Sequence, residues 1–219
     1  MPNPSLERPI MNSKTPAQAM PRRLAMTTLL AGAALVAGLA APSAHAAVDV
    51  MGVKIDETAK VAGTNLVLSG AGVRLKVVKV YVLGVYLGKK ETSQAAVLAA
   101  PGPKRFLIHC IHELSGEEFG SAFLAGINKN LDKDEKAKLF KPLEKLGEVF
   151  EKIPGLKTGD VIIGDWIPGQ GTIMTLNGKP VSEPIPEPLF YNAVLRIWYG
   201  DKPADIALKK SLLGIEQNY

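Results

Sequence analysis

The feature that most constrains this chain is an apolar, strand-like segment that contains a fixed positive charge. Residues 68–87 read LSGAGVRLKVVKVYVLGVYL, and this mixture of Val, Leu and Tyr between glycines favours strand over helix. A strand this apolar is expected to be covered on both faces, or on one face and by a ligand. Arg74 lies inside it and Tyr81 follows. The guanidinium of Arg74 therefore needs a partner, either an acidic side chain or a bound molecule.

The first 46 residues have the organisation of an export signal. Arg22 and Arg23 precede an apolar run at residues 29–41, and SAHA at residues 43–46 resembles an Ala-x-Ala cleavage site. We expect cleavage there, a single domain over residues 47–219, and location in the periplasm of a Gram-negative bacterium. The competing interpretation is an uncleaved anchor, but the run is short for a bilayer span. We expect no transmembrane segment after cleavage.

Removal of this leader changes the charge balance of the chain. The chain has 26 Lys and Arg and 21 Asp and Glu; four of the basic and one of the acidic residues lie in the leader, which leaves 22 and 20. A nearly balanced charge without a basic block predicts no nucleic-acid binding. The rest of the chain is long enough to form one domain with a core. Cys110 is the only cysteine, which excludes an intramolecular disulfide.

The predicted elements come in blocks of one kind. Strand patterns cover residues 48–55, 66–68, 68–87, 105–112, 160–166 and 171–176. The dipeptide Asn177-Gly178 predicts a hairpin that pairs Leu176 with Pro180 and Val181. Strands and helices in blocks, without βαβ alternation, predict an α+β fold with a largely antiparallel sheet and helices on one face.

Helices are predicted over residues 92–100, from Ser115 onward, and over residues 132–152, 189–199 and 205–213. Ser115 and Glu118 have the spacing of a capping box. The apolar stripe that follows contains Phe119, Ala122, Phe123 and Ile127. Pro142 is expected to kink or restart the next helix, because proline lacks a backbone donor.

Four segments stand out in their order along the chain: GAGVR at residues 70–74, KVYVLGVYL at 79–87, HELSGEEF at 112–119, and NAVLRIWYGDKPADIALKKSLLG at 192–214. In this order they resemble the chalcone isomerase superfamily. The last is similar to the ending common in the family's bacterial branch. The resemblance implies an open-faced β-sandwich, in which a large antiparallel sheet is covered by a layer of helices and a ligand cleft lies between them.

The resemblance also implies site positions. True plant isomerases place an Arg, a Thr, a Tyr, an Asn and a late Ser or Thr around the flavonoid, and the matching residues here are Arg74, Tyr81, Phe119, Gly126 and Ile197. Phe, Gly and Ile have no side-chain donor for a developing negative charge. We therefore expect no catalytic residue and no chalcone isomerisation.

The fatty-acid-binding members of the superfamily are more similar at these positions. They pair an Arg with a Tyr, which together hold a carboxylate at the mouth of an apolar cavity. The resemblance implies that role for Arg74 and Tyr81. The ligand-binding residues that we predict are Arg74, Tyr81, Phe119, Phe123 and Ile197.

The spacing of the Arg and the Tyr raises a geometric difficulty. Arg74 and Tyr81 are seven residues apart, so on one unbroken strand their side chains would point to opposite faces. Convergence requires a bulge or a strand break around Lys76 to Lys79. The competing interpretation is that Arg74 forms a salt bridge with an internal acid such as Glu113, and that Tyr81 is a core residue.

Other candidate chemistry is weaker. His109 and His112 face opposite sides of a strand and no second ligand cluster follows, so we expect no metal site and no cofactor. Cys110 lies on an apolar face and is expected to be a buried, inert thiol. Trp166 and Trp198 are interpreted as core or rim aromatics.

Three functions follow from these patterns. A carrier of a fatty acid or similar apolar carboxylate requires a deep apolar cleft that reaches Arg74 and Tyr81. An isomerase or lyase for a phenolic or flavonoid-like substrate requires further polar donors and a group with a shifted pKa. A periplasmic protein-interaction module requires an exposed apolar patch and no cleft. The residues favour the carrier, and they set no oligomeric state.

Overall fold

The computed structural model describes residues 46–215 of the chain. The predicted leader, apart from its last residue, lies outside the described residues, so its cleavage stays a prediction. Within residues 46–215, no helix is both long and apolar enough to cross a bilayer.

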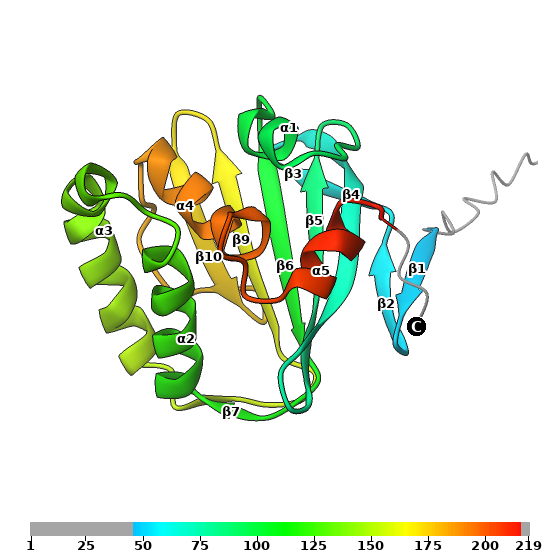
Figure 1. Ribbon diagram of the computed structural model, residues 1–219, viewed down its shortest axis with the longest axis horizontal. Helices are drawn as coiled ribbons and strands as arrows, with labels where there is room; N and C mark the ends of the chain where they lie inside the picture. Colours follow the sequence, from blue (N-terminus) through cyan, green and yellow to red (C-terminus); the bar gives the residue numbers. More distant parts are fainter. Residues whose placement is uncertain (1–45, 216–219) are drawn as a thin grey trace, which may run out of the picture. The chain divides into compact units, whose positions relative to one another are not determined.

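A seven-stranded sheet forms the centre of the fold (Figure 1). Its strands lie in the order β11-β10-β9-β6-β5-β4-β3, and each pairs antiparallel with its neighbours. In chain order they are β3 (Thr58–Val61), β4 (Thr64–Leu75), β5 (Lys79–Leu87), β6 (Lys104–Cys110), β9 (Val161–Ile167), β10 (Gly171–Leu176) and β11 (Lys179–Pro180). Two small antiparallel pairs complete the strands: β1 (Ala47–Val50) with β2 (Val53–Asp56), and β7 (Leu114–Ser115) with β8 (Gly155–Leu156).

The larger helices cover one face of this sheet. Helix α5 packs on β4, α4 packs on β10, and α2 packs against both α4 and α3; Figure 1 shows α4 and α5 in front of the strands. The helices are α1 (Gln94–Ala99), α2 (Gly116–Asn128), α3 (Lys133–Glu151), α4 (Pro188–Tyr199) and α5 (Ile206–Leu212). The predicted α+β fold, a large antiparallel sheet covered by helices, is confirmed.

Strand β5 is covered on both faces, as its apolar composition predicts. Leu83 and Val85 point to the helices and join the main core. Val82 and Tyr86, on the alternate positions, pack in a second cluster with Ile55 of β2. The β1–β2 hairpin therefore covers the face that the helices leave open, which explains a strand without a polar side.

The glycines of the sequence GAG at residues 70–72 have a packing role. An added Cβ at Gly70 would collide with the backbone of Leu212, and one at Gly72 would meet Leu208 and Ser211. Both glycines lie on β4 where α5 crosses it. They allow the helix to approach the strand closely, which brings the end of β4 under the helical layer.

Two predictions about the strands need correction. Residues 48–55 form two strands, not one, because Met51 and Gly52 adopt positive φ and turn the chain. The hairpin at Asn177-Gly178 pairs Leu176 with Lys179, one residue tighter than predicted. This tightness follows from the positive φ of both turn residues, which gives a two-residue loop.

The alternative that a new helix starts at Pro142 is also wrong. Helix α3 continues from Lys133 to Glu151 with Pro142 inside it. A capping box between Asp132 and Glu135 stabilises its start. Leu139 and Leu146, before and after the proline, are both fully buried, so packing on each side offsets the one missing backbone donor.

Candidate ligand-binding cavity

A chain reversal, not a single strand, brings Arg74 and Tyr81 together. Strand β4 ends at Leu75, β5 begins at Lys79, and Arg74 lies directly opposite Tyr81 in the antiparallel register. Directly opposed residues project from the same face of a sheet. The Arg74 Cζ atom lies 5.6 Å from the centre of the Tyr81 ring, within the range of a cation–π contact. The strand break required around Lys76 to Lys79 is present.

A bulge accompanies this break. The register shifts between Arg74 and Leu75, because Leu75 pairs with Lys79 while Arg74 pairs with Tyr81. Val80 is the extra residue, and both it and Tyr81 pack in the core on the helix side of the sheet. The bulge thus turns two consecutive side chains toward the helices.

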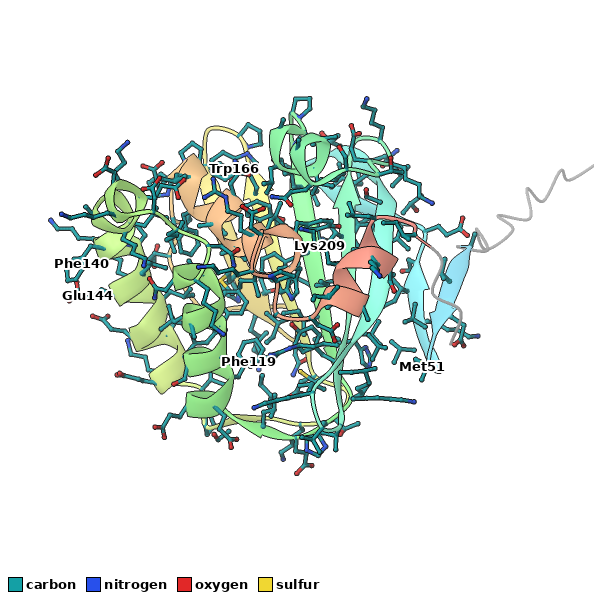
Figure 2. The ribbon with its side chains drawn as sticks, in the orientation of Figure 1. Met51, Phe119, Phe140, Glu144, Trp166 and Lys209 are labelled. Carbon is teal, nitrogen blue, oxygen red and sulfur yellow. The ribbon has the colours of Figure 1, made fainter. Side chains whose placement is uncertain are left out.

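All five predicted ligand-binding residues line one cavity between this strand end and helices α2 and α4. Its volume is about 210 Å³. Phe119 and Phe123 come from α2, and Ile197 from α4; Figure 2 shows Phe119 beside α2, toward the sheet. Six further residues complete the lining: Lys76, Val80, Leu114, Glu118, Ala122 and Ala204. The wall is mainly apolar; its charged residues are Arg74 and Lys76 at the strand end and Glu118 on α2.

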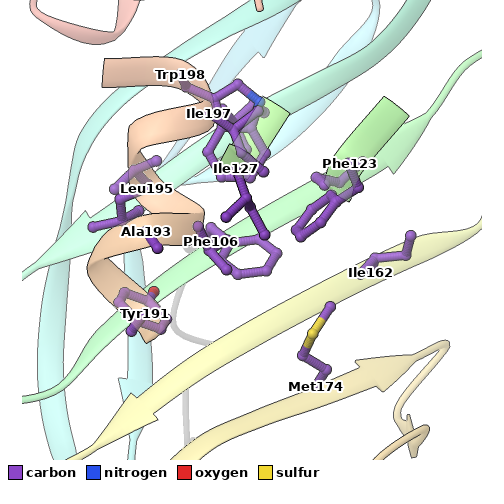
Figure 3. Packing of buried hydrophobic residues seen from close by; sticks show 14 of the residues in the cluster. Phe106, Phe123, Ile127, Ile162, Met174, Tyr191, Ala193, Leu195, Ile197 and Trp198 are labelled. Carbon is purple, nitrogen blue, oxygen red and sulfur yellow. The ribbon is translucent and has the colours of Figure 1, made fainter. Parts of the chain in front are cut away.

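The Tyr81 hydroxyl accepts a hydrogen bond from Trp198, a residue expected from the sequence to be a core or rim aromatic. Trp198 Nε1 donates a hydrogen bond of 2.7 Å to Tyr81 Oη. The Trp198 ring packs on Phe106 and Phe123, with ring centres 5.4 and 6.1 Å away (Figure 3). These contacts fix the indole and, through it, the phenol. No sequence signal separates this Trp from an ordinary core aromatic, because its role depends on α4 lying over β5.

The phenol of Tyr81 is a donor at neutral pH. Burial raises its pKa, although the Arg74 guanidinium and the Trp198 hydrogen bond partly oppose the shift. The oxygen already accepts a bond from Trp198, and among residues 46–215 no acceptor takes the Tyr81 proton. Its O–H is therefore free to donate to a ligand.

Arg74 has no acidic partner in the described part of the chain. Its Nε atom is buried and makes no hydrogen bond. The salt bridge to Glu113, the competing interpretation, is not formed among these residues. Arg105 and Arg196, by contrast, each bind a carboxylate, on Asp165 and Glu135. Arg74 is thus the one described arginine that has an unfilled site for an anion.

Two nearby carboxylates have other partners. Asp205 caps α5 through the N–H groups of Ala207 and Leu208, and its second oxygen accepts from Leu75 N at 2.9 Å. Glu118, on the cavity rim, accepts from the backbone and hydroxyl of Ser115. Those bonds lower the pKa of Glu118, with a smaller contribution from Lys76, so this carboxylate stays ionised.

The remaining candidates do not join the cavity. Cys110 is buried, and burial raises its thiol pKa to about 11, which agrees with an inert thiol. Trp166 packs near Tyr191, with ring centres 6.3 Å apart. Among the described residues, no group of three or more His, Cys, Asp or Glu side chains is placed to hold a metal ion.

Comparisons with known proteins agree with the architecture. Residues 47–214 match the family described as chalcone isomerase-like. The fold is similar to the crystal structure of a fatty-acid-binding protein from Arabidopsis thaliana, with a TM-score of 0.60 and 16% sequence identity over 74% of this chain and 92% of that chain. No curated protein sequence matches this chain significantly. At this identity the structural likeness shows the fold.

Proposed function

Because this chain belongs to the chalcone isomerase-like family, we propose that it binds a fatty acid or similar apolar carboxylate in this cavity and catalyses no reaction on it. The main observation in support is that Arg74 is a half-buried cation and has no acidic partner in the described chain. It faces an apolar cavity beside a phenol with a free proton. At its site this chain resembles the fatty-acid-binding members more than the true isomerases.

The ligand carboxylate would bind between Arg74 and Tyr81. A guanidinium presents two parallel N–H donors to a carboxylate, and a hydrogen bond to a charged group contributes about 1.5–3 kcal/mol. The acyl chain would then lie along Phe119, Phe123 and Ile197. Each buried CH₂ adds about 0.8 kcal/mol. The Arabidopsis thaliana protein of the same fold is a fatty-acid-binding protein, which supports this ligand class.

The cavity volume restricts the chain length. A carrier with a deep cleft would have a pocket of about 300–1,000 Å³, whereas this cavity has about 210 Å³. It accommodates a head group and a short acyl segment. A longer chain requires displacement of Phe119 or Phe123, or leaves carbons outside the protein. We expect affinity to rise with chain length for short acids and then to level off.

A direct binding experiment tests the proposal. Protein purified from its expression host is examined by native mass spectrometry for co-purified acids, and is then titrated with saturated acids of six to sixteen carbons by calorimetry. Arg74→Ala should weaken binding about 100-fold, as expected for the loss of two charge-assisted bonds. Lys54→Ala, an exposed cation on β2, is the matched control and should leave affinity unchanged. A wild-type protein that ignores every acid contradicts the proposal.

Absence of catalysis is proposed because several positions lack the polar groups of the isomerases. Gly126 has no side chain and therefore supplies no donor between α2 and α4, and a Cβ there would press on Ile197. Tyr81 keeps its proton at neutral pH because burial raises its pKa. We expect no turnover of naringenin chalcone above the uncatalysed rate, measured by absorbance. Measurable turnover that Arg74→Ala abolishes would favour the isomerase alternative.

We also propose export to the periplasm with cleavage after residue 46. The support is the order of charged, apolar and small residues in the leader. Intact-mass measurement of protein from a periplasmic extract should give a chain that begins at Ala47. A full-length mass in the membrane fraction would indicate an uncleaved anchor.

A further inference from the structure

The turn between β4 and β5 has an unusual tip. Residues 76–79 read Lys-Val-Val-Lys, and the Val77 side chain is 96% exposed and Val78 46%. Turns normally carry Gly, Asn, Asp, Pro or Ser, which satisfy their backbone requirements. This one has none, and no residue in it adopts positive φ. Val77 contributes almost nothing to packing and Val78 leaves 46% of its surface exposed, so the core does not account for two adjacent apolar residues at this tip.

The charges beside the valines suit an anionic lipid surface. Lys76 and Lys79 flank the tip and both are exposed. A lysine can lay its apolar stem along hydrocarbon while its ammonium reaches phosphate groups. The acidic side chain beside Lys76 is Glu118, which stays ionised and offsets part of the Lys76 charge, whereas Lys79 lies outside the cavity lining that contains Glu118. Apolar side chains between lysines are typical of segments that lie at a membrane interface.

The tip also adjoins the cavity. Lys76 and Val80, on the two sides of the turn, both line it. Figure 1 shows the turn at the same end of the sheet as β7, and Leu114 of β7 lines the cavity too. A surface that contacts Val77 and Val78 would therefore lie at the edge of the cavity.

We propose that the turn Lys76–Lys79 docks on an anionic phospholipid bilayer, with Val77 and Val78 inserted among the acyl chains. An apolar acid then enters the cavity from the lipid phase without crossing water. The loading step rests on the proposed function, whereas the docking step does not. Two valines and two lysines give weak, reversible attachment.

Vesicle sedimentation tests the docking. Exported protein is mixed with vesicles of phosphatidylglycerol and phosphatidylcholine, and its partition coefficient is measured. The double variant Val77→Asp/Val78→Asp should bind at least tenfold more weakly. Phe140→Asp is the matched control, because Phe140 is 64% exposed on the outer side of α3, away from the cavity (Figure 2). Equal loss in both variants, or no loss in either, overturns docking through the turn.

The charge contribution is tested separately. Lys79 lies outside the cavity lining, so Lys79→Glu should leave ligand binding intact. It should weaken partition about fivefold or more, since one basic residue near an anionic surface accounts for a factor of that order. Vesicles of phosphatidylcholine alone should bind wild type and Lys79→Glu equally. A preference for these neutral vesicles contradicts the assignment.

Transfer measurements separate this inference from the proposed function. The double valine variant should bind a dissolved short-chain acid with wild-type affinity, yet take a labelled fatty acid from vesicles at least tenfold more slowly. If the variant loses vesicle binding and neither the wild type nor the variant binds an acid, the result supports docking and refutes the proposed carrier function. Acid binding with unchanged transfer in the variant refutes docking. A dimer of wild type that the variant dissolves, seen by analytical ultracentrifugation, would assign the tip to self-association and also refute docking.

Discussion

Two arginines in the central sheet differ in the residue that lies opposite each of them on the neighbouring strand. Arg105 on β6 lies opposite Asp165 on β9, and its Nε and Nη2 atoms bind the two carboxylate oxygens at 2.7 and 2.6 Å. Arg74 on β4 lies opposite Tyr81, a phenol with no negative charge. Both side chains are half-buried. The register is of the same kind, but only the first cation is neutralised within the described chain.

The difference separates a structural charge from a candidate binding charge. Arg105 joins two strands and its pKa is raised by the Asp165 bond, so its interaction energy contributes to folding. Arg74 has the same donors with an unpaired Nε and a cavity beside them. Its interaction energy remains available to an anion from outside. Substitutions that exchange or remove these two environments test the distinction.

The largest effect is expected when Arg74 receives an internal partner. Ala122 lines the cavity, and in Ala122→Glu a new carboxylate would compete for the guanidinium. Fatty-acid affinity should fall about 100-fold, which corresponds to the loss of a charge-assisted pair of bonds. Calorimetric titration measures it. Ala125→Glu places the same charge on an exposed position of α2 outside the lining and should bind normally. Normal binding by both variants would contradict the role of Arg74.

Removal of the structural pair should affect folding and spare binding. Asp165→Ala leaves Arg105 without its carboxylate in a site where the two side chains are 20% and 18% exposed. We expect a loss of about 2 kcal/mol in the free energy of unfolding, below the 3–5 kcal/mol of a fully buried pair. Urea denaturation measures it.

The exposed pair Lys89–Glu91 provides the control for that measurement, because the Lys89 side chain is 78% exposed. Lys89→Ala should change stability by at most about 0.5 kcal/mol. Acid affinity should be unchanged in both variants. A stability loss as large as that of Asp165→Ala would show that burial does not distinguish these pairs.

A smaller effect is expected from the residue that orients Tyr81. Trp198→Phe removes the Nε1–H donor but keeps an aromatic ring. A double-mutant cycle with Tyr81→Phe should give a coupling free energy of about 1 kcal/mol, the net contribution of one hydrogen bond. Acid affinity of Trp198→Phe should fall about fivefold, because the phenol loses its fixed direction. Additive effects of the two substitutions would exclude this coupling.

The smallest effect is expected from pH between 6 and 9. Burial raises the pKa of Tyr81 above its ordinary value near 10, so its donor persists through this range and acid affinity should stay constant. A marked fall in calorimetric affinity between pH 7 and 9 would show that another group controls binding.

Alkali should act on folding instead. The pKa of Tyr86 is raised to about 12, mainly by burial. Stability that comes from its neutral form is fully present below pH 10 and is lost as pH rises toward 12, because the unfolded chain releases the proton first. Denaturation curves at pH 7, 9, 10 and 11 should show this decline. It should be less steep in Tyr86→Phe, and an equal slope would contradict the assignment.

Much of the architecture follows from local pattern. The capping box at Ser115 and Glu118 starts α2 where the sequence predicts it, and the run at residues 171–176 is β10. Each of these depends on a few neighbouring residues. The two-sided burial of β5 also follows from its composition, since a strand without polar positions leaves no face for water.

The size of the cavity did not follow from the sequence. The sequence could assign Phe119 and Phe123 to the cavity wall. The volume that the cavity encloses, however, depends on how closely α2 and α4 approach each other. Gly126 against Ile197 sets that approach. The contact joins residues 71 positions apart, and no periodicity encodes it. The cavity is therefore smaller than the cleft that a carrier was expected to have.

The sequence by itself determined that a cation at Arg74 lies in an apolar strand segment near a tyrosine, because hydrophobic pattern and charge are properties of neighbouring residues. It required a break between them. Only the tertiary structure decided that the break is a turn with a bulge at Val80, that no described acid reaches Arg74, and that Trp198 holds the phenol. Register and helix packing join residues far apart in the chain, and these long-range contacts convert an isolated charge into a candidate site.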